Sequence, residues 1–194
     1  MSLNVEKCIQ AWTNSLRQMN SKADIVFFGD SLTYYGDFAS VFPNKVVCNL
    51  GLRGDTIQGL MVRVEQVKML EPRRVFLMSG INDVASLTPE LFENQYDALI
   101  RDLIEKLKNV EIIVQSLLPV NDIEFNISCN NVQILERNTR IHVIAKKYDL
   151  AFIDLFSLYA TDGILPIAET IDGIHLFPDA YHKWKRVLLN YSGS

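Results

Sequence analysis

The chain has 194 residues, of which 48% are hydrophobic and 22% are charged, a composition typical of an ordinary globular domain. Its formal net charge is −4 and no run of five like charges occurs, so we expect no nucleic-acid partner. We predict a single domain over residues 1–194, with its core at about 22–190.

Three cysteines, Cys8, Cys48 and Cys129, match neither the spacing of a zinc site nor a disulfide framework, so we expect free, inert thiols. The first residues lack the apolar stretch of a secretory signal. No run of apolar residues is long enough to cross a bilayer, and we expect no membrane span. The chain as given is expected in the cytoplasm, or exported or periplasmic if a signal peptide was removed.

Apolar residues recur at helical spacing over about 4–20, which predicts a helix packed on the core. Beyond it, five apolar runs rich in β-branched residues alternate with amphipathic segments. The runs predict strands at 24–28, 45–50, 74–79, 111–117 and 150–155, and the segments predict helices at about 56–70, 89–108, 131–148 and 178–191. Pro89, after Thr88, and Pro178 stand where helices begin. Such strands pair in parallel through right-handed crossovers, which predicts a three-layer α/β/α sandwich around a five-stranded parallel sheet.

Polar residues just after the strands are the first candidates for chemistry, because ligands of parallel sheets bind at the carboxyl ends of the strands. Four blocks meet this condition, at residues 29–32, 49–56, 80–83 and 172–175. Ser31 follows a buried strand and a glycine, which places its hydroxyl at the sheet edge. A nucleophile there could meet both a base and a carbonyl carbon. In isolation such a serine would more often only cap a helix or a turn, but the other three blocks favour the nucleophile.

A serine nucleophile needs a base, and the chain has three histidines. His142 and His182 fall inside predicted helices, so each is interpreted as an ordinary helix residue. His175 lies in a loop three residues after Asp172, close enough for the carboxylate to hold the imidazole N–H. A metal site is a poor interpretation of this pair, because no further cluster supplies the remaining ligands. We therefore expect no metal and no organic cofactor.

The four blocks, in this order, resemble those of the SGNH/GDSL hydrolase family, and the resemblance spans about residues 22–190. It implies a flavodoxin-like sheet and a triad of Ser31, His175 and Asp172. It also implies an oxyanion hole formed by the backbone N–H groups of Ser31 and Gly54 and the side-chain amide of Asn82. Asn82 carries neutral donors and Gly54 permits close backbone approach, although Gly54 could also serve only a tight turn and Asn82 could only brace its loop.

The aspartates within the same blocks, Asp30, Asp55 and Asp83, are interpreted as structural acceptors of backbone N–H groups.

Further likeness lies in residues 24–31, 54–56, 117–119 and 172–176, which are similar to platelet-activating-factor acetylhydrolase catalytic subunits and to bacterial acetylesterases that deacetylate sugars. Those relatives remove short acyl groups, so the resemblance implies an O-acetyl or similarly small ester on a sugar or a lipid, without choosing between them. Loops 33–44 and 120–130 are expected to shape specificity. Their large aromatic residues, expected to wall a small pocket, are Tyr34, Tyr35, Phe38, Phe42 and Phe125.

We therefore predict a serine esterase that hydrolyses a small-molecule carboxylic ester through an acyl-enzyme intermediate. An acyltransferase with the same triad is the first alternative, since sequence does not reveal which acceptor enters the second half-reaction. A catalytically inactive carbohydrate- or lipid-binding module is the second, against which the intact site residues argue. Relatives dimerise, so a homodimer is an open expectation.

Overall fold

The computed structural model describes residues 22–192, so the helix predicted at about 4–20 lies outside the described residues. Its centre is a sheet of five parallel strands in the order β2-β1-β3-β4-β5. This is the flavodoxin-like order, and it confirms the predicted three-layer α/β/α fold. The strands are β1 (Ile25–Gly29), β2 (Val47–Gly51), β3 (Arg74–Met78), β4 (Glu111–Gln115) and β5 (Ala151–Ile153).

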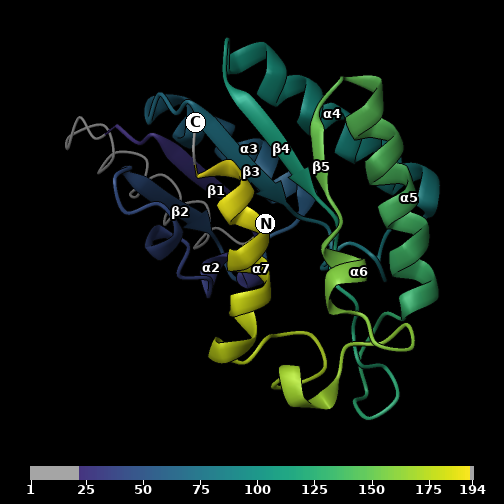
Figure 1. Cartoon of the computed structure of the whole chain (residues 1–194). Helices are drawn as coiled ribbons and strands as arrows, with labels where there is room; N and C mark the ends of the chain where they lie inside the picture. The colour runs from purple at the N-terminus through teal and green to yellow at the C-terminus, as the bar shows by residue number, and fades with distance from the viewer. Residues whose placement is uncertain (1–21, 193–194) are drawn as a thin grey trace.

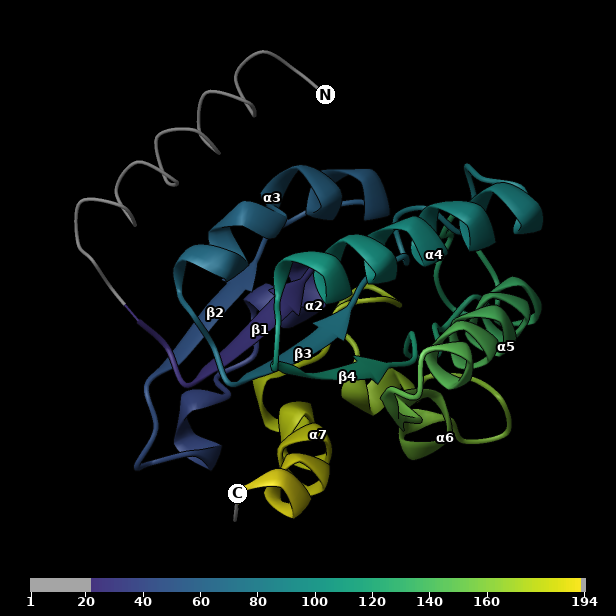
Figure 2. The same ribbon diagram turned by 90° about the horizontal axis from the view of Figure 1, so that it is seen from above.

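The strands are rich in apolar residues, as expected of strands that are covered on both faces of the sheet. In β1, Val26 and Phe28 face one core cluster while Phe27 faces the other, as the two-residue period of a strand requires. Helices α3 (Ile57–Met69), α4 (Pro89–Lys106) and α5 (Asn131–Lys147) bury apolar residues in the first cluster. Helices α2 (Ser31–Tyr34), α6 (Leu155–Tyr159) and α7 (Tyr181–Leu188) do so in the second. Figures 1 and 2 show these layers, with α3 and α4 on the opposite side of the sheet from α7.

The long helices begin where their local sequence provides a cap. Thr88 accepts a hydrogen bond from the backbone N–H of Leu91, and Pro89 is the first residue of α4, as predicted. Asn130 and Gln133 form a reciprocal capping box at the start of α5. Thr56 caps α3 through the backbone N–H of Gly59. These caps fix where each helix leaves the preceding loop.

Two of the predicted boundaries were wrong in the type of structure they assigned, while the others agree within two residues. The run predicted as a strand at 150–155 ends as a strand at Ile153, and Asp154 then caps α6 by accepting from the backbone N–H of Ser157 at 3.0 Å. The apolar residues of this short helix are buried, so they extend the strand-like pattern. The segment predicted as a helix at 178–191 is α-helical only in α7, and 3₁₀ turns flank it at Pro178–Ala180 and Leu189–Tyr191.

Candidate active site

Ser31 is the first residue of α2, directly beyond the carboxyl end of β1. The carboxylate of Asp30 caps this short helix by accepting from the backbone N–H of Leu32 at 3.0 Å. The side chain of Ser31 is only slightly exposed, and its Oγ lies 2.9 Å from Nε2 of His175. The serine hydroxyl and the imidazole predicted as its base are therefore in hydrogen-bonding contact, although 144 positions separate them in the chain.

Asp172 holds the other side of the imidazole. Its Oδ2 lies 2.7 Å from Nδ1 of His175, and its Oδ1 accepts from the backbone N–H groups of His175 and Ile174 at 2.8 and 3.1 Å. Partial burial alone would raise the pKa of Asp172, but these hydrogen bonds lower it below its ordinary value. Because an ionised carboxylate can only accept, Nδ1 is the protonated nitrogen of the neutral ring. Nε2 is then free to accept the proton of Ser31.

The loop that carries Asp172 and His175 is fixed by backbone contacts that sequence reasoning missed. The hydroxyl of Thr170 donates to the carbonyl of His175 and accepts from the N–H of Gly173, both at 2.9 Å. The backbone N–H of Asn121 donates to the carbonyl of Gly173 at 2.8 Å, which joins the loop to the segment after β4. The imidazole is therefore held by a loop whose own backbone is well anchored.

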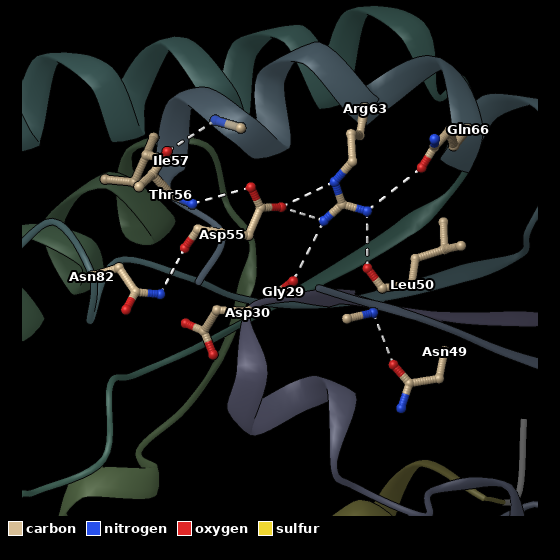
Figure 3. Close-up of polar contacts among 12 residues, drawn as sticks. Gly29, Asp30, Asn49, Leu50, Asp55, Thr56, Ile57, Arg63, Gln66 and Asn82 are labelled. Atoms are coloured by element: carbon tan, nitrogen blue, oxygen red, sulfur yellow. Dashed lines mark hydrogen bonds and ion pairs between the residues drawn. The ribbon is translucent and has the colours of Figure 1, made fainter. Parts of the chain in front are cut away.

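The predicted oxyanion donors lie on the loops that follow β2, β1 and β3, three adjacent strands of the sheet. Gly54 is exposed and has φ +71°, a left-handed conformation that glycine adopts without strain. The side-chain Nδ2 of Asn82 donates to the backbone carbonyl of Asp55 at 2.8 Å (Figure 3). This bond uses one of the two N–H groups of the amide.

The three aspartates interpreted as structural do accept backbone N–H groups. Asp30 accepts from Leu32, Asp55 accepts from Thr56 at 3.1 Å, and Asp83 accepts from Ile57 at 3.0 Å. Burial, with repulsion from Asp55 and Asp83, raises the pKa of Asp30 to about 7. Burial likewise raises the pKa of Asp83 to about 6, with a smaller contribution from Asp55.

The other two histidines lie away from this constellation. His142 is exposed on α5, where its ring stacks on Phe152 at a centroid distance of 4.6 Å. His182 is exposed on α7, and its Nδ1 lies 2.7 Å from the backbone carbonyl oxygen of Asp179. Both are helix residues, as predicted.

The predicted aromatic wall was partly wrong. Phe38 and Phe42 are buried in the core cluster beneath α7, where Phe38 stacks on Phe27 at 4.2 Å, so neither lines the site. Tyr34 and Tyr35 are exposed. The ring of Tyr35 meets the His175 ring edge-on at 5.8 Å.

Phe125 is half-buried beside Gly173, and the guanidinium of Arg53 lies over the Tyr35 ring at 5.8 Å. Tyr35 therefore contacts the imidazole, and Arg53, from the loop after β2, contacts Tyr35.

Two of the three cysteines lie within the described residues. Cys129 is buried and Cys48 half-buried, each as a free thiol, and burial raises the pKa of both; Cys8 lies outside the described residues. Over residues 22–192, no three His, Cys, Asp or Glu side chains are grouped so as to hold a metal ion. Within the same range, no helix combines the length and apolarity needed to span a membrane.

A serine hydroxyl bonded to a histidine, itself held by a carboxylate at the carboxyl edge of a parallel sheet, is the arrangement that serine hydrolases use. Comparison with protein families agrees with this class. The chain belongs to the GDSL-like lipase/acylhydrolase family, whose sequence model matches residues 27–183. A serine nucleophile and a catalytic triad are typical of that family, and the protein is a hydrolase that acts on esters.

Solved structures share the fold at low sequence identity. A proposed platelet activating factor from Streptococcus pneumonia is 23% identical with a TM-score of 0.81, over 99% of this chain and 100% of that one. A GDSL-like lipase from Bacteroides thetaiotaomicron is 18% identical with a TM-score of 0.78, over 95% and 96%. An acetyl xylan esterase is 21% identical with a TM-score of 0.68, over 84% and 97%. No curated protein sequence matches the chain significantly.

Proposed function

We propose that the protein is a serine esterase that cleaves carboxylic esters with a short acyl group through an acyl-enzyme intermediate on Ser31. The observation that carries this proposal is the continuous hydrogen-bonded chain from Ser31 Oγ through His175 to Asp172. In the first half-reaction, Oγ attacks the ester carbonyl carbon while Nε2 of His175 takes its proton. Asp172 stabilises the imidazolium that forms, and the alcohol leaves with that proton.

In the second half-reaction, His175 removes a proton from water, which attacks the acyl carbon and releases the acid and Ser31. Each tetrahedral intermediate places a negative charge on the former carbonyl oxygen. We assign its stabilisation to the backbone N–H groups of Ser31 and Gly54 and to the second N–H of Asn82. One donor of this kind is typically worth about 3 kcal/mol in the transition state.

A short acyl group is supported by the phenol ring of Tyr35, which meets the His175 ring edge-on at 5.8 Å and takes up space beside the reacting atoms. Similarity to an acetyl xylan esterase is a further, weaker argument for acetyl esters. Sugar and lipid alcohols both remain compatible with this arrangement.

Ser31→Ala tests the proposal. We expect the variant to lose hydrolysis of p-nitrophenyl acetate and covalent labelling by a fluorophosphonate, while the wild type releases acetate without any added acceptor. Thr33→Ala, two residues further along α2, is a matched control for local disturbance of the helix. Wild-type turnover in Ser31→Ala would contradict the assignment of the nucleophile, and acetate release that required an acceptor alcohol would indicate an acyltransferase.

A further inference from the structure

Arg63 is an arginine in the interior of the protein, on the face of α3 that covers the sheet. Its side chain is 0% exposed. Figure 3 shows its guanidinium reaching three acceptors near the carboxyl edge of the sheet, and also the side-chain oxygen of Gln66 on the same helix. Nη1 donates to the carbonyl of Leu50 at 3.0 Å, Nη2 to the carbonyl of Gly29 at 3.4 Å, and Nε to Oδ2 of Asp55 at 2.9 Å. Nη2 also forms an ion pair with Asp55.

Two of these acceptors lie close in the chain to a proposed oxyanion donor. Gly29 ends β1 two residues before Ser31, and Asp55 directly follows Gly54. The backbone carbonyl of Asp55 accepts from the side-chain amide of Asn82. One buried guanidinium therefore ties together the ends of β1 and β2 and, through Asp55, the residue whose carbonyl holds the Asn82 amide.

We propose that Arg63 is a positioning residue for catalysis, which acts through Asp55 to hold the Gly54 backbone and the Asn82 amide where the oxyanion forms. The inference rests on the proposed function and extends it to a residue that does not touch substrate. Oxyanion donors must stand at the position of the developing charge, and a misplacement of about 1 Å can lower the rate roughly 100-fold.

The surroundings of Asp55 leave its carboxylate little freedom. Its Oδ1 accepts from the backbone N–H of Thr56, and its Oδ2 is bonded to Arg63. A Cβ on Gly59 of α3 would lie 1.9 Å from Oδ1, so the helix has room for the carboxylate only because this residue is glycine. The side chain is thus held from three sides. Its backbone carbonyl, the partner of Asn82, is fixed with it.

The pair is held as ions in a setting that disfavours each ion alone. Burial raises the pKa of Asp55 and lowers that of Arg63, and in both cases the charge of the partner opposes the shift. The Phe28 ring lies 4.9 Å from the guanidinium carbon and limits its movement. Lysine keeps the charge but not the planar fork, so it cannot contact Gly29, Leu50 and Asp55 in the same geometry.

The test is a double-mutant cycle between Arg63→Lys and Asn82→Ala, measured with p-nitrophenyl acetate. Asn82→Ala should lower kcat by roughly 10²–10³ with little change in KM, because the donor acts in the transition state. Arg63→Lys should lower kcat by roughly 10–100-fold with KM within about twofold. The double variant should fall below Asn82→Ala by clearly less than the loss that Arg63→Lys causes alone, because the part of the effect that passes through Asn82 is already lost.

Arg74→Lys is the matched control. Arg74 is also buried and paired with a carboxylate, Glu111, but it begins β3 at the opposite edge of the sheet. We expect Arg74→Lys to lower the melting temperature of the protein and to leave kcat unchanged. Two results would overturn the role of Arg63. One is an equal loss of kcat in Arg63→Lys and Arg74→Lys when both variants lose the same melting temperature. The other is a double variant whose loss of kcat is the product of the two single losses.

If Arg63→Lys is not folded at the assay temperature, Asp55→Asn takes its place in the cycle. Asparagine keeps an acceptor for the N–H of Thr56 but loses the ion pair, and the same non-additivity with Asn82→Ala is expected. Activity that survives Ser31→Ala, or a full kcat in Asn82→Ala, would contradict the proposed function itself. Additive losses with those two variants behaving as expected would contradict only the role of Arg63.

Discussion

The carboxyl group of Asp30, next to Ser31, should make the protein less stable as the pH rises, and Asp30→Asn should remove much of that dependence. Asp30 is fully buried. One of its oxygens accepts from the N–H of Leu32, and the other has no hydrogen-bond partner among the described residues. Burial, followed by the nearby carboxylates of Asp55 and Asp83, raises its pKa to about 7 from an ordinary value of 3.8.

The sign and size of this change in stability with pH follow from the linkage between protonation and folding. Between about pH 4 and pH 7 the folded state keeps a proton that the unfolded state has released, so the free energy of unfolding falls as the pH rises. This stabilising contribution is complete below the unfolded pKa and is lost by the time the pH passes the folded pKa. A difference of about three pKa units corresponds to roughly 4 kcal/mol, which is a large part of the stability of an ordinary domain.

Urea unfolding of the wild type and of Asp30→Asn at several pH values between 4.5 and 8 measures this effect. Asparagine still caps α2, so we expect the free energy of unfolding of the variant, relative to wild type, to rise by a few kcal/mol across the range. Asp37→Asn is the control: the hydrogen bond and charge of Lys185 lower the pKa of the exposed Asp37, so its relative stability should change weakly and in the opposite direction. A flat difference for Asp30→Asn would refute the argument.

Two further predictions concern activity. His175→Ala should lower kcat/KM for p-nitrophenyl acetate by several orders of magnitude. His142→Ala and His182→Ala should stay close to wild type, because both histidines are exposed on helices. A large loss in His142→Ala would contradict the assignment of His175 as the base. Among p-nitrophenyl esters measured below any micelle-forming concentration, acetate and butyrate should exceed octanoate in kcat/KM. A tunnel would instead gain about 0.8 kcal/mol for each buried methylene, so an optimum at eight carbons or more would contradict the short-acyl proposal.

The fold was predictable because its signals are local. The strands are mostly apolar, and the caps of α4 and α5 are made by residues three apart in the sequence. The two wrong boundaries arose where that signal is ambiguous. In α6 the buried Leu155 and Phe156 continue the apolar pattern of β5, so only the capping contact from Asp154 marks the change to helix.

The contacts of the site were predictable to the extent that they follow from parallel topology. Ser31 and Asn82 lie where strands end, and the spacing of Asp172 and His175 already brings them within reach of each other. Thr170 and Asn121, which support the loop that carries Asp172 and His175, were not found, because their hydrogen bonds depend on how distant segments meet. Loop aromatic residues were misjudged for the same reason, since core and surface positions in an irregular loop have no fixed period.

The burial of Arg63 follows from the helical periodicity of the sequence. Arg63 lies three residues after Leu60 and four before Val67, both fully buried, so helical spacing places it on the core face of α3. A guanidinium cannot remain there without an anionic partner, because an unpaired buried charge is strongly destabilising. The nearest carboxylate on the N-terminal side that could reach it is Asp55, in the block that also carries Gly54. The sequence alone therefore indicates a buried charge pair between Arg63 and the block that carries Gly54.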